Sequence, residues 1–246
     1  MDITFVLVAM LGVLLTGIAK SGFAGGVGVV AVPMMAPFIG GAEAIGILLP
    51  VLLLMDLLTL RVFRRQLSWA LFKPLLPGIV IGIVLGSLLL GVVSERGIQA
   101  LIGLMGFWVL AQRRWPWLAG RGVNLQGTAA FSLGGIAGVG STLAHAGAAP
   151  LQAYYLLQGL DKERFLAQVS LAVACMNAIK LVPYGALGLL EFTLSPLLLV
   201  LLPLAWLGVQ IGRWLSRKID GELFFRIMMW LLAINSLWLL GQAVVG

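Results

Sequence analysis

Residues 17–33 read GIAKSGFAGGVGVVAVP, and residues 134–150 read GGIAGVGSTLAHAGAAP. Both stretches are rich in glycine, interrupt long apolar runs and end in proline. Glycine lets the backbone leave helical geometry, and proline fits the first turn of a helix. Each stretch therefore predicts a break, after which a new helix begins inside an otherwise apolar segment.

The composition around these breaks is that of an integral membrane protein. Charged residues make up 10% of the chain, against about 25% in soluble domains. Hydrophobic residues make up 61% of the 246 residues, and the mean hydropathy is +1.09. A soluble globule could not bury that much apolar surface, and a disordered chain or a nucleic-acid binder is excluded as well. The single cysteine, Cys175, excludes an intrachain disulfide.

Ten apolar segments are predicted as helices in an all-α, polytopic membrane fold. They cover residues 3–20, 27–41, 44–62, 68–93, 97–112, 127–144, 148–159, 164–188, 193–216 and 223–244. The first segment has no basic leader, so we expect a helix there rather than a removed signal peptide. Segments 27–41 and 148–159 are too short to cross about 30 Å of hydrocarbon unaided. Each of them, with the segment before it, either spans the membrane or forms a re-entrant hairpin, and the sequence leaves both arrangements open.

The motifs recur once along the chain, in the same order in both halves. They are the two Gly-rich stretches, Met55-Asp56 with Met176-Asn177, and the P-x4-G-x3-G patterns that start at Pro77 and Pro203. Five segments in each half would invert the second half relative to the first, which is typical of secondary transporters. We therefore predict a first membrane repeat at 1–112, a cytoplasmic linker at 113–126 and a second, inverted repeat at 127–246.

Loop charges orient the predicted helices. If every segment changes side, nearly all loop Lys and Arg residues fall on one side, and only Arg96 falls on the other. The side rich in Lys and Arg is cytoplasmic by the positive-inside rule. We therefore expect a multi-pass protein of the cell inner membrane with both termini in the periplasm. The formal net charge of +7 reflects these loops rather than a nucleic-acid partner.

The first break carries five residues suited to binding an anion: Lys20, Ser21, Gly22, Gly25 and Gly26. Free backbone N–H groups at the start of the following helix, together with its dipole, favour negative charge. Lys20 adds a positive charge and Ser21 adds a hydroxyl donor. A cytoplasmic loop, with an interfacial lysine and glycines for close helix packing, accounts equally well for these residues.

The second break offers Ser141, Thr142, His145 and Gly147, and the short segment after it offers Gln152. These residues place hydrogen-bonding groups between apolar flanks. His145 is the only histidine, and it could bind an anion or relay a proton because its charge changes near neutral pH. A histidine that simply bonds to a neighbouring helix is an equally good explanation.

Three polar residues lie inside predicted spans: Asp56, Asn177 and Lys180. Such residues usually face the protein interior and mark a transport path. Asn177 and Lys180 share one helix face, so we expect both to line that path. Asp56 would hold a basic partner or act as a gate, and Arg61 is a candidate partner near the cytoplasmic surface. The alternative for Lys180 is a side chain that extends to the membrane surface.

Several motifs of enzymes do not occur. The sequence has no G-x4-G-K-[ST] phosphate loop and no H-E-x-x-H zinc motif, and no G-x-S-x-G setting is evident. One histidine and one cysteine cannot make a soft-metal site. We therefore expect a protein that is not an enzyme and that needs no cofactor or metal.

Taken together, the motifs resemble those of the TauE/SafE sulfite exporter family of anion permeases. The resemblance is carried by residues 17–26, 31–33, 48–50, 55–56, 64–65, 141–150, 154–158 and 160–162, and by Asn177-x-x-Lys180 and Pro183-Tyr184. It covers essentially the whole chain and implies export of sulfite, organosulfonates or related small anions from the bacterial cytoplasm. Ser21 replaces a glycine common in the family's first break, and Ala148-Ala149 replace part of a Gly-Gly pair in the second. Both changes narrow the space near the backbone.

The function predicted from these observations is a secondary transporter that exports a small sulfur-containing oxyanion, either sulfite or a small organosulfonate, across the bacterial inner membrane. The alternative is an anion channel or a permease for a different small anion or metabolite. A membrane scaffold or intramembrane enzyme fits the glycine breaks and buried charges less well. The expected partners are a small anion and the lipid bilayer. The small-residue face at Gly82 and Gly86 would serve packing within the chain or a homodimer.

Overall fold

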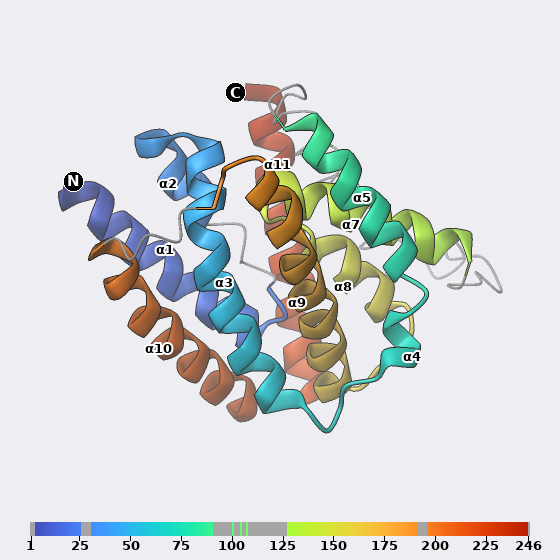
Figure 1. The fold of residues 1–246 in the computed structure, drawn as a ribbon. Coiled ribbons are helices and arrows are strands. Elements are labelled where there is room, and N and C mark those ends of the chain that lie inside the picture. Colours follow the sequence, from blue (N-terminus) through green and yellow to red (C-terminus); the bar gives the residue numbers. More distant parts are fainter. Residues whose placement is uncertain are drawn as a thin grey trace.

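The computed structural model describes residues 3–25, 31–90, 127–190 and 196–245, together with positions 100, 104 and 107, and these residues form helices joined by turns and short loops. No strand occurs among them. The helices are α1 (Ile3–Gly22), α2 (Ala31–Ile39), α3 (Gly41–Phe63), α4 (Trp69–Phe72), α5 (Leu76–Leu89), α7 (Thr128–Ala144), α8 (Ala148–Leu156), α9 (Lys162–Ala186), α10 (Pro196–Lys218) and α11 (Gly221–Val245), shown in Figure 1. Gly26, the predicted linker 113–126 and nearly all of the segment predicted at 97–112 lie outside the described residues.

Four of the described helices are long and apolar enough to cross a membrane. They are α1, α3 from Glu43 onward, α9 and α10, while α5 and α7 are shorter apolar helices. This result confirms an all-α fold with several membrane-spanning helices. Helices α2 and α8 have nine residues each. At about 1.5 Å per residue, a helix of this length is too short to cross the membrane unaided, as the sequence predicted for both segments.

One predicted helix is wrong. The sequence predicted a continuous helix at 68–93, but the structure divides it into α4 and α5. The physical reason is a pair of prolines: Pro74 lacks the N–H that would continue α4, whereas Pro77 lies in the first turn of α5, where no N–H is needed.

Glycines bring two pairs of helices into close contact. A Cβ at Gly17 of α1 would lie 3.0 Å from the Cα of Gly208 in α10, and a Cβ at Gly138 of α7 would lie 3.0 Å from the carbonyl carbon of Gly82 in α5. Small residues allow such an approach between backbones. The glycines of the two P-x4-G-x3-G patterns therefore serve packing within the chain, including the Gly82 face that was a candidate for a dimer contact.

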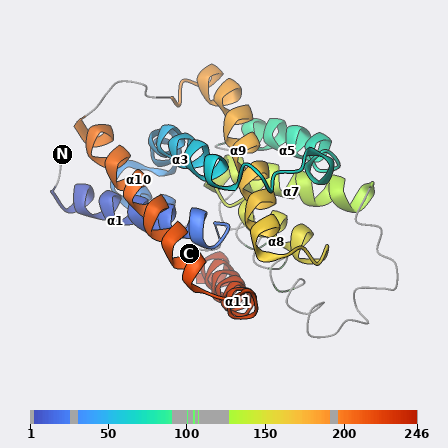
Figure 2. The ribbon, with the colours of Figure 1, turned by 90° about the horizontal axis from the view of Figure 1, so that it is seen from below.

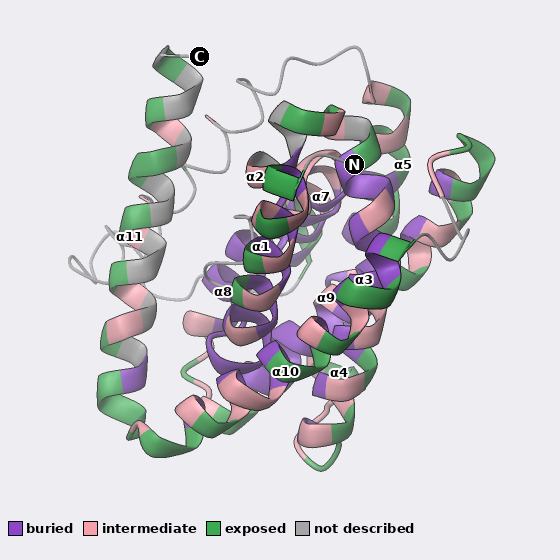
Figure 3. Ribbon diagram, turned by 90° about the vertical axis from the view of Figure 1, so that its left-hand side faces the viewer, coloured by how far each residue is buried: buried purple, intermediate pink, exposed green. Residues whose placement is uncertain are grey.

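The two packed pairs flank a central layer. In Figures 1 and 2, α1 and α10 lie on one side, α5 and α7 lie on the other, and α3 and α9 lie between them. Figure 3 shows that buried residues concentrate toward the interior, whereas α11 lies along one edge. The polar residues in the middle of the central helices, among them Asp56, Asn177 and Lys180, are buried in the interior of the protein.

Candidate functional site

The first break begins where α1 ends at Gly22. Ala24 has a left-handed backbone with φ of 52°, and the N–H of Gly25 donates to the carbonyl oxygen of Ala19 at 2.9 Å. A left-handed conformation is unusual for a residue with a Cβ. The chain therefore leaves α1 in a defined turn with Lys20 in its last helical residues.

The second break repeats this geometry. His145 follows α7 with φ of 53°, and the N–H of Ala146 donates to the carbonyl oxygen of Gly140 at 2.9 Å. Ala24 and His145 thus have the same local backbone geometry. They are 121 residues apart, which is also the separation of the hydrogen-bonded Asp56 and Asn177. The sequence comparison paired Gly17 with Gly134, the first glycines of the two stretches. That pairing differs from the pairing of Ala24 with His145 by about one helical turn.

The two breaks meet at one cavity of about 40 Å³. This is several times the roughly 10–15 Å³ that an enclosed water needs, and it is room for a small ion. The lining residues come from α1, the first break, α3, α7, the second break, α8 and α9. They are Thr16, Lys20, Ala24, Gly25, Leu52, Ser141, His145, Gly147, Ala148, Val169, Ser170, Val173, Met176 and Asn177. Lys20 and His145 therefore line the same cavity.

Lys20 and Asp56 form a buried ion pair beside this cavity. The Lys20 Nζ lies 2.7 Å from the Asp56 Oδ1, with the two side chains 6% and 3% exposed. The Nζ also donates to the Leu52 carbonyl oxygen at 3.2 Å. Asn177 Nδ2 donates to the other carboxylate oxygen of Asp56 at 2.6 Å. The basic partner of Asp56 is therefore Lys20 rather than Arg61.

Lys180 and His145 form a second buried pair. The Lys180 Nζ lies 2.7 Å from the His145 Nδ1 and donates to the Ser141 carbonyl oxygen at 3.0 Å. The other ring nitrogen, Nε2, lies 3.0 Å from the Ile45 carbonyl oxygen. A carbonyl can only accept, so we assign the proton to Nε2, which leaves Nδ1 to accept from Lys180. Lys180 is fully buried and does not extend to the membrane surface.

Five described residues predicted for substrate binding do not line the cavity: Ser21, Gly22, Thr142, Gln152 and Lys180. Lys180 contacts the lining residue His145 instead. The Thr142 hydroxyl donates to a carbonyl oxygen one turn earlier in its own helix. The Ser21 hydroxyl lies 2.8 Å from the Val209 carbonyl oxygen of α10 and 3.0 Å from the Gly17 carbonyl oxygen of its own helix. Gly22 packs against α10, where a Cβ would meet the carbonyl oxygen of Gly212 at 2.8 Å. Gln152 donates to the Ala24 carbonyl oxygen at 2.8 Å and so joins α8 to the first break.

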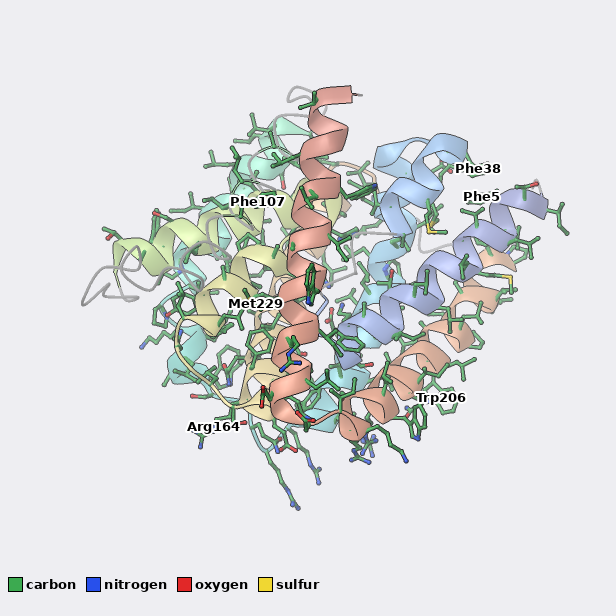
Figure 4. All side chains as sticks on the ribbon, turned by 180° about the vertical axis from the view of Figure 1, so that it is seen from behind. Phe5, Phe38, Phe107, Arg164, Trp206 and Met229 are labelled. Atoms are coloured by element: carbon green, nitrogen blue, oxygen red, sulfur yellow. The ribbon has the colours of Figure 1, made fainter. Side chains whose placement is uncertain are left out.

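Arg61 lies away from the cavity, on an exposed basic surface at the end of α3. This surface also contains Arg64, Arg65 and Arg213. Figure 4 shows many side-chain nitrogen atoms at the end of the structure where Arg164 is labelled. In Figure 1, the start of α1 and the end of α11 both lie toward the opposite end. Arg61 therefore belongs to a charged end of the molecule and not to the buried site.

The sequence analysis missed Ser170. Its side chain is 3% exposed, it lines the cavity, and its Oγ has no hydrogen-bond partner. Buried hydroxyls normally have one, so this Oγ is available to a ligand. Ser170 lies two helical turns before Asn177 on the same face of α9, and that spacing is the signal that could have found it. Thr16 was missed as well, but its hydroxyl is bonded to the Gly12 carbonyl oxygen.

No group of three or more His, Cys, Asp or Glu residues that could hold a metal occurs in the part of the chain that the structure describes. The helical fold and the small cavity between the two breaks, with Lys20 and His145 in its lining, define the class as a polytopic membrane protein with ionisable side chains around a buried cavity. The family model described as "Sulfite exporter TauE/SafE" matches residues 9–239. The chain therefore belongs to the TauE/SafE sulfite exporter family, whose members are transporters. Comparison with curated proteins and with solved structures gave no match.

Proposed function

We propose that this protein is a secondary transporter that exports a small sulfur-containing oxyanion, either sulfite or a small organosulfonate, across the bacterial inner membrane. The observation that carries the proposal is the cavity between the two breaks. It is lined by Lys20, by His145 in contact with Lys180, and by the unpartnered hydroxyl of Ser170. Buried cationic and hydroxyl donors around a cavity suit an oxyanion.

The start of α8 supports the same proposal. Gly147 and Ala148 line the cavity at this helix N-terminus, and no side chain caps it. The first backbone N–H groups of a helix lack intrahelical partners, and its dipole favours negative charge there. Together with Lys180, this end of α8 would hold the anion without any cofactor.

The membrane potential can supply the driving force for export. A cytoplasm negative by about 100 mV favours outward movement of each negative charge by about 2.3 kcal/mol. In our proposal the basic end with Arg61 and Arg213 faces the cytoplasm, as the positive-inside rule expects. Both termini would then be periplasmic.

An inverted repeat is the proposed basis of alternating access. It is supported by the two left-handed turns at Ala24 and His145, and by the reciprocal packing of α1 on α10 and of α7 on α5. Asp56 of the first half and Asn177 of the second half occupy corresponding positions and are hydrogen-bonded to each other. Such a contact is expected near the pseudo-twofold axis that would relate the two halves. Rocking of one half about the cavity would open it to each side in turn.

Flux into proteoliposomes tests this function. The purified protein would be reconstituted, a membrane potential imposed, and the movement of sulfite and methanesulfonate measured against empty liposomes. We expect potential-driven flux that Lys180→Gln abolishes and that Lys218→Gln leaves intact, because Lys218 is exposed. Absence of flux in folded wild-type protein, or full flux in Lys180→Gln, would contradict the proposal.

The alternative is an anion channel or a permease for a different small anion or metabolite. The donors around the cavity are ammonium, hydroxyl, amide and backbone N–H groups, which recognise oxyanions in general rather than sulfur alone. A flux that saturates with substrate concentration favours a transporter. A flux that rises in proportion to concentration favours a channel.

A further inference from the structure

We propose that the cavity selects singly charged oxyanions over doubly charged ones, because the buried groups that the structure describes around it supply at most one net positive charge. This inference rests on the proposed function, in which the cavity binds the transported anion. It follows from a count of charges and protons over two buried pairs.

The first pair contributes no net charge. The Lys20 Nζ and the Asp56 Oδ1 are 2.7 Å apart and both side chains are almost fully buried. An ammonium beside a carboxylate is neutral as a pair, and it stays neutral if the proton moves from one to the other. The Asn177 amide, which donates to the second carboxylate oxygen, is neutral as well.

The second pair contributes at most one positive charge. At 2.7 Å between the Lys180 Nζ and the His145 Nδ1, one nitrogen must donate and the other must accept. A lysine ammonium and an imidazolium each have only donors, so both cannot be protonated in this contact. Since Nε2 already donates to the Ile45 carbonyl oxygen, the pair carries one charge when Lys180 is protonated.

The other cavity groups add hydrogen-bond donors and the partial positive end of a helix dipole, but no full charge. Ser170 offers a free hydroxyl, and Gly147 and Ala148 bring the N-terminus of α8. Leu52, Val173 and Met176 make apolar walls. The buried charged side chains in the described residues are Lys20, Asp56 and Lys180.

A bound monoanion would therefore be balanced, whereas the second charge of a dianion would have no counter-charge. A buried charge without a partner is strongly disfavoured. The ligands whose charge matches the single positive charge of the cavity are hydrogensulfite and organosulfonates with one negative charge. Sulfate and fully ionised sulfite would be rejected.

Methanesulfonate and sulfate form a matched pair of probes. Both are tetrahedral about sulfur, and a methyl group in one replaces a charged oxygen in the other. Binding to the wild-type protein in detergent would be measured by calorimetry at constant ionic strength. We expect methanesulfonate to bind at least about tenfold more tightly, which corresponds to 1.4 kcal/mol. Equal or tighter binding of sulfate overturns this inference but leaves an anion site in place, whereas binding of neither anion overturns the proposed function and this inference together.

Two variants separate charge from hydrogen bonding. Asp56→Asn raises the net charge around the cavity by one. We therefore expect the ratio of the methanesulfonate affinity to the sulfate affinity to fall by at least about tenfold. Ser170→Ala removes a donor without changing the charge, so we expect weaker binding of both anions at an unchanged ratio. A folded Asp56→Asn protein with the wild-type ratio contradicts the charge count. Because this variant leaves Lys20 without its partner and can fail to fold, the wild-type comparison is decisive on its own.

Discussion

The ion pair between Lys20 and Asp56 gives a prediction that can be worked from the structure. At 2.7 Å, the Coulomb attraction is about 6 kcal/mol at an effective dielectric of 20, and it is largely offset by the loss of solvation. Lys20→Met would leave the carboxylate buried with only the Asn177 amide, and we expect it to lower the free energy of unfolding by about 3–5 kcal/mol. In the double variant with Asp56→Asn, no charge is left unpaired, and an amide oxygen can still accept from Asn177. We expect the double variant to stay within about 2 kcal/mol of the wild type.

The assay is denaturant unfolding in detergent micelles, followed by the fluorescence of the eight tryptophans. Arg226→Gln is the control, because its ion pair with Glu222 is exposed, and we expect a change below about 0.5 kcal/mol. The reasoning would be refuted by a Lys20→Met protein as stable as the wild type. It would also be refuted by a double variant that loses as much as the two single variants together.

Three further predictions concern the backbone and the contact between the two breaks. A Cβ at Gly138 would lie 2.5 Å from the Ile79 carbonyl oxygen, so Gly138→Ala should lower the free energy of unfolding by about 1–3 kcal/mol. Gly221→Ala is the control, because a Cβ at Gly221 would meet open space, and it should not lower this free energy. Ala24→Gly should keep or raise thermal stability in a melting experiment, because glycine adopts the left-handed turn without strain. Gln152→Leu removes the hydrogen bond to the Ala24 carbonyl oxygen. We expect the free energy of unfolding to fall by about 1–3 kcal/mol and methanesulfonate to bind more weakly in calorimetry. If neither value changes, this contact does not hold the two breaks together.

The membrane class, most helix positions and the two breaks follow from the sequence alone. Long apolar runs must form helices in a bilayer, since every backbone polar group needs a partner there. Glycine and proline at 17–33 and 134–150 therefore stand out as interruptions, and the short helices α2 and α8 were found from them. Lys20, His145, Asn177 and Lys180 were recognised because polar residues in apolar runs are rare.

Only the tertiary structure decided which of these residues meet. Asp56 is five positions from Arg61 in the sequence, yet it pairs with Lys20 because α1 and α3 pack against each other in the interior. Thr142 satisfies its hydroxyl within its own helix, and Ser21 has carbonyl acceptors in its own helix and in α10. Ser170, in contrast, is left free beside the cavity. Local spacing determines which face of a helix a residue occupies. The partner on that face is determined by helix packing between distant segments. Here that packing places two buried pairs of ionisable side chains, Lys20 with Asp56 and Lys180 with His145, around one cavity.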